Sequence, residues 1–142
     1  MHYNYVLWVI FMTFAEKLKA ARMQAGLSQD KVSAELGISK RTIVNYEKGV
    51  TLPTSDKLPA IAKYFGVSIE SLISENEEFV AAAYQQGGSK SAREAKALVD
   101  DVSGLFAGGR LSEEEKDAVM RAIQNAYWVA KEESKKYTPK RS

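Results

Sequence analysis

The stretch from Gln29 to Gly49, QDKVSAELGISKRTIVNYEKG, constrains the fold more than any other part of the chain. Its pattern predicts two short helices, over about 29–36 and 40–48, joined by a tight turn. A serine precedes each helix at the position where an N-cap is expected, and Gly37 stands where the first helix needs a residue that tolerates positive φ. Two short helices joined in this way are typical of a helix-turn-helix.

The second predicted helix carries polar and basic residues on the face opposite Ile43. Lysine and arginine match the acceptors of guanine in the major groove, and asparagine matches the donor and acceptor edge of adenine. A solvated helix face is charged in the same way, so this pattern by itself fits both interpretations. The frame of two capped helices favours a helix that reads DNA bases.

Residues 14–73 resemble the lambda-repressor-like (XRE) helix-turn-helix domain over its whole length. The matching segments are FAEKLKAARMQAGLSQ, ELGISKRTIVNYEKG and LPAIAKYFGVSIESLI. The resemblance implies an all-α fold, with a five-helix DNA-binding domain over 13–75. It also implies that double-stranded DNA is the partner and that the second helix of the helix-turn-helix contacts its bases.

Two sets of DNA contacts are expected on this domain. The base-reading set comprises Lys40, Arg41 and Asn45, with marginal roles for Thr42 and Val44. The phosphate-contacting set comprises Gln29, Ser39, Lys48 and Thr51. Gln29 is placed in it because it matches the family position that anchors to phosphate. Contacts of this second kind position a protein on DNA without reading its sequence.

Arg22 stands just off the apolar stripe of a helix expected over about 14–24. The family resemblance implies a structural ion pair between Arg22 and Glu47. The alternative is a solvated arginine with no such partner.

The composition excludes several classes of function. The chain has 142 residues, no cysteine and a single histidine, His2, so disulfides and thiolate metal sites are ruled out and most general-base chemistry is removed. No phosphate-binding glycine loop or nucleophile motif is present. We therefore expect no enzyme activity, no cofactor and no metal, in a cytoplasmic protein.

Charge is weakly informative, because the net charge is only +2. Residues 13–75 hold nine Lys and Arg against seven Asp and Glu, whereas residues 76–142 hold eleven of each kind. DNA affinity must therefore come from where the cations point rather than from their number.

Both ends of the chain differ from the rest. Residues 1–12 form an apolar extension that is too short for a membrane helix of about 20 residues. Three interpretations of it are open: a start upstream of the natural one at Met12, a hydrophobic arm that docks on the body, or a membrane contact. Residues 137–142 are expected to be a polar, frayed tail.

The remaining residues predict a linker followed by a helical hairpin. Residues 76–91 contain a Gly-Gly pair and are expected to be a linker, with a helical turn or two over 79–84 and a flexible break over 85–89. Residues 92–136 carry two helical stripes separated by a second Gly-Gly pair, with a capping box formed by Ser112 and Glu115. The residues expected at or near the seam are Leu98, Val102, Phe106, Ile123 and Tyr127.

An isolated helix pair buries too little surface to be stable alone, so the hairpin needs a partner surface. It could dock on its own DNA-binding domain or on a second copy, and the Gly-Gly linker favours self-association. We therefore expect a dimeric repressor that binds a near-palindromic operator. The alternative is an antitoxin or protein-interaction module whose hairpin binds an unknown partner protein. A third hypothesis, a membrane-tethered sensor, is supported only by the apolar residues 5–12.

Overall fold

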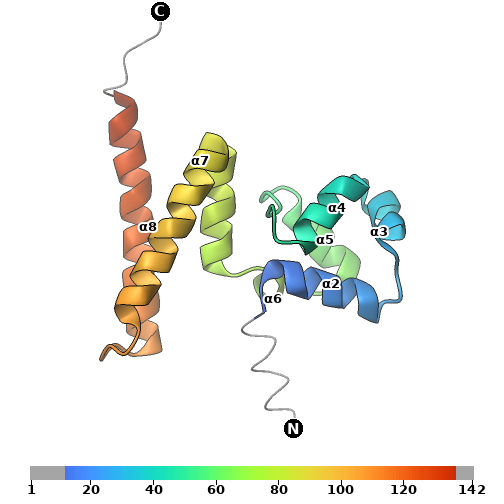
Figure 1. Ribbon diagram of the computed structural model, residues 1–142, viewed down its shortest axis with the longest axis horizontal. Helices are drawn as coiled ribbons and strands as arrows, with labels where there is room; N and C mark the ends of the chain where they lie inside the picture. Colours follow the sequence, from blue (N-terminus) through green and yellow to red (C-terminus); the bar gives the residue numbers. More distant parts are fainter. Residues whose placement is uncertain (1–11, 137–142) are drawn as a thin grey trace, which may run out of the picture. The chain divides into compact units, whose positions relative to one another are not determined.

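The computed structural model describes residues 12–136, and its regular structure is entirely helical (Figure 1). The predicted all-α fold is thus confirmed. The helices are α2 (Phe14–Gln24), α3 (Gln29–Leu36), α4 (Lys40–Glu47), α5 (Leu58–Phe65), α6 (Ile69–Leu72), α7 (Glu75–Phe106) and α8 (Glu113–Lys136). The chain divides after Ala92 into two compact units. The predictions made for residues 1–11 and 137–142 lie outside the described residues.

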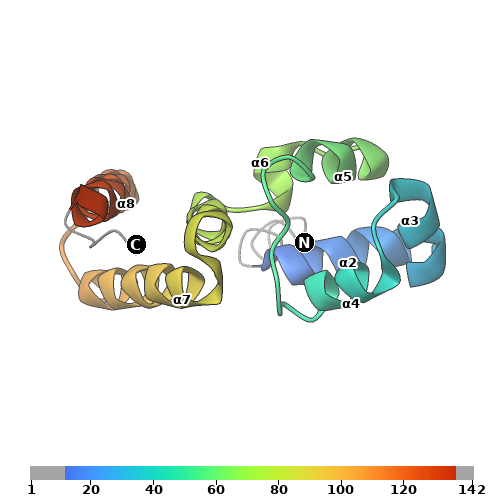
Figure 2. The same cartoon turned by 90° about the horizontal axis from the view of Figure 1, so that it is seen from above.

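The first unit is built around one apolar core that α2 to α6 enclose (Figure 2). The rings of Phe14 and Tyr46 meet edge to face in it, with centroids 5.9 Å apart. The buried residues of this core are Phe14, Leu18, Val32, Ile43, Tyr46, Leu58, Ile61, Ala62, Leu72 and Ile73. Each of the five helices therefore contributes to a single core, as the family resemblance implies.

Serine and threonine hydroxyls begin most of these helices. The side chains of Thr13, Ser28, Ser39 and Ser68 accept hydrogen bonds from backbone N–H groups in the first turns of α2, α3, α4 and α6. Such a cap satisfies an N–H group that has no partner inside the helix. The short helices of this unit thus start where the sequence places these hydroxyl residues.

Helix α7 runs through the expected linker over 76–91, because residues 75–106 are helical except at Gly88, where two helices meet at a kink. Gly88 has φ 70° and ψ −156°, which only glycine adopts without strain. The segment before it contains FVAAAY, in which alanine favours a helix, and Phe79 and Ala83 are buried. Propensity and burial therefore extend the helix as far as Gly88, where a kink separates it from the helix that follows.

Glu77 joins the start of α7 to the start of α2. Its carboxylate accepts from the N–H of Phe14 at 3.0 Å and from the N–H of Ser74 at 3.1 Å. The N–H of Glu77 in turn donates to Oγ of Ser74 at 3.1 Å, which completes a capping box. One carboxylate thus caps two helix N-termini, where negative charge is favoured. The first turn of α7 is therefore an integral part of the first unit.

The second unit contains the last part of α7 and the whole of α8. Ser112 caps α8, because its Oγ accepts from the N–H of Glu115. Val102 and Met120 are buried in it, and Lys131 Nζ of α8 lies 2.8 Å from Glu94 Oε2 of α7. Of the predicted seam residues, Val102 is buried and Leu98, Phe106, Ile123 and Tyr127 are partly buried. Leu105 and Val129 remain 81% and 62% exposed. The unit thus retains apolar surface that it does not cover itself.

The double cap at Glu77 leads to a testable expectation. Glu77→Gln removes the charge and leaves one oxygen for two N–H donors, so the free energy of unfolding should fall by about 1–3 kcal/mol, the cost of a lost charge-assisted hydrogen bond. Denaturant unfolding measures that loss, and amide exchange at Phe14 and Ser74 should become faster. The control is Glu78→Gln at the exposed neighbouring position. Equal effects of the two variants would show that the double cap does not stabilise the unit.

Candidate DNA-binding surface

Helices α3 and α4 are held at a fixed angle by the turn between them. Gly37 ends α3 with φ 67° and ψ 26°, the left-handed conformation that favours glycine. Ser33 Oγ then donates to the carbonyl of Ile38 at 2.5 Å, and the N–H of Ile38 donates back to the carbonyl of Ser33 at 3.2 Å. These bonds set the direction in which α4 leaves the turn.

One face of α4 is buried, which determines what the opposite face presents. Ile43 is 0% exposed and Tyr46 is 3% exposed, so neither can move without opening the core. Rotation of α4 about its axis would expose both side chains at a cost of about 1.5–3 kcal/mol each. The polar side of α4 is therefore held facing outward.

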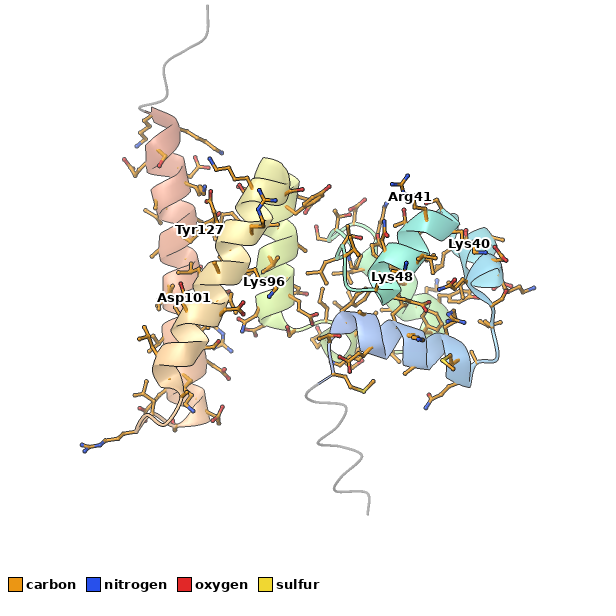
Figure 3. All side chains as sticks on the ribbon, viewed as in Figure 1. Lys40, Arg41, Lys48, Lys96, Asp101 and Tyr127 are labelled. Atoms are coloured by element: carbon orange, nitrogen blue, oxygen red, sulfur yellow. The ribbon has the colours of Figure 1, made fainter. Side chains whose placement is uncertain are left out.

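The five predicted base readers all lie on α4, but they differ in exposure. Lys40 and Arg41 are exposed, as is the phosphate candidate Lys48, and Figure 3 labels all three. Thr42, Val44 and Asn45 are partly buried. The hydroxyl of Thr42 lies 2.8 Å from Ser39 Oγ and so takes part in the cap of α4. Arg41 and Asn45 are the predicted readers whose side chains form no hydrogen bond or ion pair within residues 12–136.

The predicted phosphate contacts lie at the ends of the two helices. Gln29 begins α3 and Ser39 caps α4, so both are near helix N-termini, which attract anions. Lys48 follows the other end of α4, and Thr51 lies in the loop beyond it, where its N–H is 3.5 Å from the carbonyl of Asn45. The set thus borders the exposed side of α4 at both ends.

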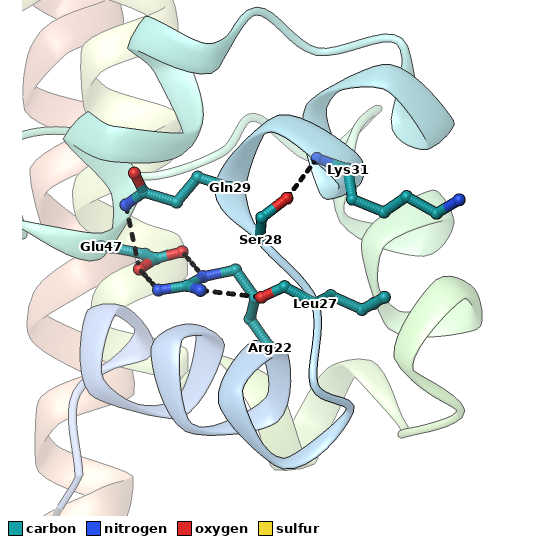
Figure 4. A network of polar contacts seen from close by, with 6 residues as sticks. All are labelled: Arg22, Leu27, Ser28, Gln29, Lys31 and Glu47. Carbon is teal, nitrogen blue, oxygen red and sulfur yellow. Dashed lines mark hydrogen bonds and ion pairs between the residues drawn. The ribbon is translucent and has the colours of Figure 1, made fainter.

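Arg22 and Glu47 form a bidentate ion pair beneath this surface (Figure 4). Arg22 Nε lies 2.7 Å from Glu47 Oε2, and Arg22 Nη2 lies 2.9 Å from Glu47 Oε1. Their side chains are 14% and 4% exposed. The hydrogen bond to Glu47 raises the pKa of the Arg22 guanidinium, against the opposing effect of burial. The pair thus joins α2 to the end of α4.

Two further bonds extend this ion pair to α3. Arg22 Nη1 donates to the carbonyl of Leu27 at 2.9 Å, immediately before the Ser28 cap. Gln29 Nε2 lies 3.4 Å from Glu47 Oε1, so this predicted phosphate contact is also part of the network. Arg22 and Glu47 therefore locate α2, α3 and α4 relative to one another.

The structure also shows polar contacts that the sequence pattern did not indicate. Tyr64 of α5 donates to Glu35 of α3 at 2.6 Å, and Lys31 pairs with the same carboxylate at 3.1 Å. The bond from Tyr64, followed by that from Lys31, lowers the pKa of the Glu35 carboxyl. Only the Lys31–Glu35 pair has a sequence signal, the i,i+4 spacing of opposite charges.

A second missed contact lies on the exposed side of the helix-turn-helix. Lys40 Nζ of α4 is 3.1 Å from Asp30 Oδ1 of α3. Nothing in the spacing of these two residues indicates the contact, because it depends on the angle between the helices. It places a carboxylate beside a predicted base reader.

The difference between buried and exposed ion pairs can be measured. Glu47→Gln leaves the Arg22 charge partly buried without its anion, which should lower the free energy of unfolding by about 3–5 kcal/mol. Glu35→Gln removes a carboxylate from an exposed ion pair, for which a much smaller loss is expected. Denaturant unfolding of both variants compares them directly. A Glu47→Gln protein as stable as Glu35→Gln would contradict the structural role of the buried pair.

Comparisons with known proteins agree with this geometry. A family model described as helix-turn-helix matches residues 18–72. A transcriptional repressor of the cryptic phage CTXphi from Vibrio cholerae is 34% identical over 45% of this chain and 58% of its own length. The immunity repressor of Bacillus phage phi105 is 25% identical over 92% of this chain and 95% of its own length.

A third relative is similar over almost its entire length. An HTH-type transcriptional regulator from Methanocaldococcus jannaschii is 41% identical over 44% of this chain and 96% of the relative. Its similarity therefore extends over nearly the whole relative and over less than half of this chain. Together with the capped helices α3 and α4, these matches show that the chain belongs to the lambda-repressor-like (XRE) family of helix-turn-helix DNA-binding transcriptional regulators, which are not enzymes.

Proposed function

We propose that this chain is a transcriptional repressor that binds a near-palindromic operator as a dimer. The observation that carries the proposal is the outward face of α4. Arg41 and Lys48 are exposed there and have no carboxylate partner within residues 12–136, while Ile43 and Tyr46 hold the opposite face in the core. The Vibrio cholerae and phi105 relatives are both named repressors, which supports the direction of control.

In the proposed complex α4 enters the major groove. Arg41 donates two hydrogen bonds to a guanine, and the Asn45 amide pairs with the edge of an adenine. Lys40 adds a second guanine contact, whereas Thr42 and Val44 offer only methyl groups to a thymine. Gln29, Ser39, Lys48 and Thr51 contact the phosphates that border the groove, which sets the register of α4. RNA polymerase is then excluded from an overlapping promoter.

A dimer is proposed because one half-site supplies too few base contacts. Each correct base pair contributes about 1–3 kcal/mol, and a genome offers about 10⁶–10⁹ competing sites. Two linked recognition helices about 34 Å apart would read two half-sites together. The second unit is the part proposed to join the protomers, since Leu105 and Val129 expose apolar surface there. No helix within residues 12–136 is long and apolar enough to cross a membrane.

The proposed base and phosphate roles predict different kinds of loss. An operator is first selected with the protein from random duplex DNA, and its consensus should be a near-palindrome. Arg41→Ala should then weaken operator binding by about 1–3 kcal/mol and relax one base position, because a bidentate contact is lost. Gln29→Ala should weaken binding to operator and random DNA by the same factor.

The control for this experiment is Lys63→Ala, which removes an exposed cation from α5. It should leave both affinities close to those of the parent. If Arg41→Ala reduced binding to operator and random DNA equally, its proposed base-reading role would be wrong.

If the protein is a dimer, its assembly should depend on concentration. Charged residues placed on the exposed apolar surface of the second unit should abolish that assembly. Light scattering of the full chain at micromolar concentration should give the mass of two protomers. Leu105→Glu combined with Val129→Glu should give a monomer that binds the operator at least about tenfold more weakly, through loss of the linked half-site. Met23→Glu, at a 62% exposed position of α2, is the control and should remain dimeric. A monomeric parent would overturn the dimer.

A further inference from the structure

The cations on the outward face of α4 are not electrostatically equivalent. Lys40 Nζ lies 3.1 Å from Asp30 Oδ1, and the two side chains are 55% and 74% exposed. Arg41 and Lys48 have no acidic partner in the described part of the chain. Among these three cations, which Figure 3 labels, Lys40 is therefore the one that carries its own counter-charge among the described residues.

Asp30 has an explanation that does not involve DNA, since an acidic residue in the first turn stabilises a helix. Glu70 provides a comparison within the same chain. It is the second residue of α6 after the cap Ser68, as Asp30 is the second residue of α3 after the cap Ser28. Glu70 has no basic partner among the described residues. A first-turn acid therefore does not require a lysine, and the contact with Lys40 needs its own explanation.

The chemistry of a lysine changes when a carboxylate is bound to it. The pair has no net charge, and a phosphate that approaches the ammonium also approaches the carboxylate, which repels it. The acceptors of guanine are neutral, so they are not repelled in this way. An ammonium group has three donors, and one bond to Asp30 leaves two for guanine O6 and N7.

We propose that Asp30 is a positioning and specificity-determining residue, which holds Lys40 as a base donor and prevents it from acting as a general phosphate contact. This inference rests on the proposed function, in which Lys40 reads a base. Exposed ion pairs are weak in water. Exclusion of water at the DNA surface lowers the local dielectric and strengthens the pair where it acts.

The first test uses random duplex DNA and does not require an operator. Asp30→Asn releases Lys40 to neutralise a phosphate, so the slope of log Kd against log salt should become steeper by about 0.9. That slope corresponds to a roughly threefold to fourfold additional loss of affinity between 50 and 200 mM salt. The steepening should disappear in the double variant Asp30→Asn with Lys40→Met. Asp30→Glu, which keeps the carboxylate, should restore the parent slope.

The matched control is Glu70→Gln, which removes one negative charge from the equivalent position of α6. A role in helix stability or in overall charge would give the same slope in Glu70→Gln and Asp30→Asn, and that result would overturn the proposal. A steepening that persisted without the Lys40 ammonium would overturn it as well. Each variant is compared at matched helical content and melting temperature.

The second test compares the operator with random DNA. Asp30→Asn should lower the ratio of the two affinities by about tenfold, the loss expected when one good base contact becomes a phosphate contact. The alternative result is that Asp30→Asn strengthens operator binding by at least the factor by which it strengthens binding to random DNA. Asp30 would then simply compete with DNA for Lys40, and the positioning role would be wrong. A parent protein with no preferred site would refute the proposed function, whereas the salt slopes on random DNA would still decide whether Asp30 restrains Lys40.

Discussion

The geometry of the DNA-binding unit depends on the partly buried ion pair of Arg22 and Glu47. Its two parallel hydrogen bonds, at 2.7 and 2.9 Å, join α2 to the end of α4, and further bonds reach Leu27 and Gln29. Apolar packing alone resists separation of these helices but permits small rotations between them. A bidentate pair has a defined plane and direction, so it also restricts rotation. The orientation of the exposed face of α4 follows from this restriction.

A second carboxylate, that of Glu77, joins the start of α7 to the start of α2 in the same unit. It caps α2 and α7 together, so the first turn of α7 is part of the DNA-binding unit. The kink at Gly88 then separates two helices that share the label α7. Glu47 and Glu77 act alike, because each carboxylate accepts from a donor that is distant in sequence, Arg22 and Phe14 respectively, and holds two helices together.

Much of the fold and of the candidate site could be predicted from residue types and spacing. The caps Ser28 and Ser39, Gly37 at the turn and the apolar residues Val32 and Ile43 act within a few residues of one another. The sequence indicated only a helical turn or two over 79–84, whereas the helix there continues as far as the kink at Gly88. Burial of Phe79 and Ala83 depends on what packs there, and no local pattern shows it.

The sequence by itself determined an all-helical chain with a helix-turn-helix, because caps, turns and helical periodicity are local properties, and its family resemblance implied a DNA-binding regulator with α4 as the candidate reading helix. Tertiary structure alone decided several polar contacts between helices. The Asp30–Lys40, Glu35–Tyr64 and Glu77–Phe14 contacts join residues that are 10, 29 and 63 positions apart. Each requires helices packed at a particular angle and distance, and that arrangement arises only when the whole core of the first unit has formed.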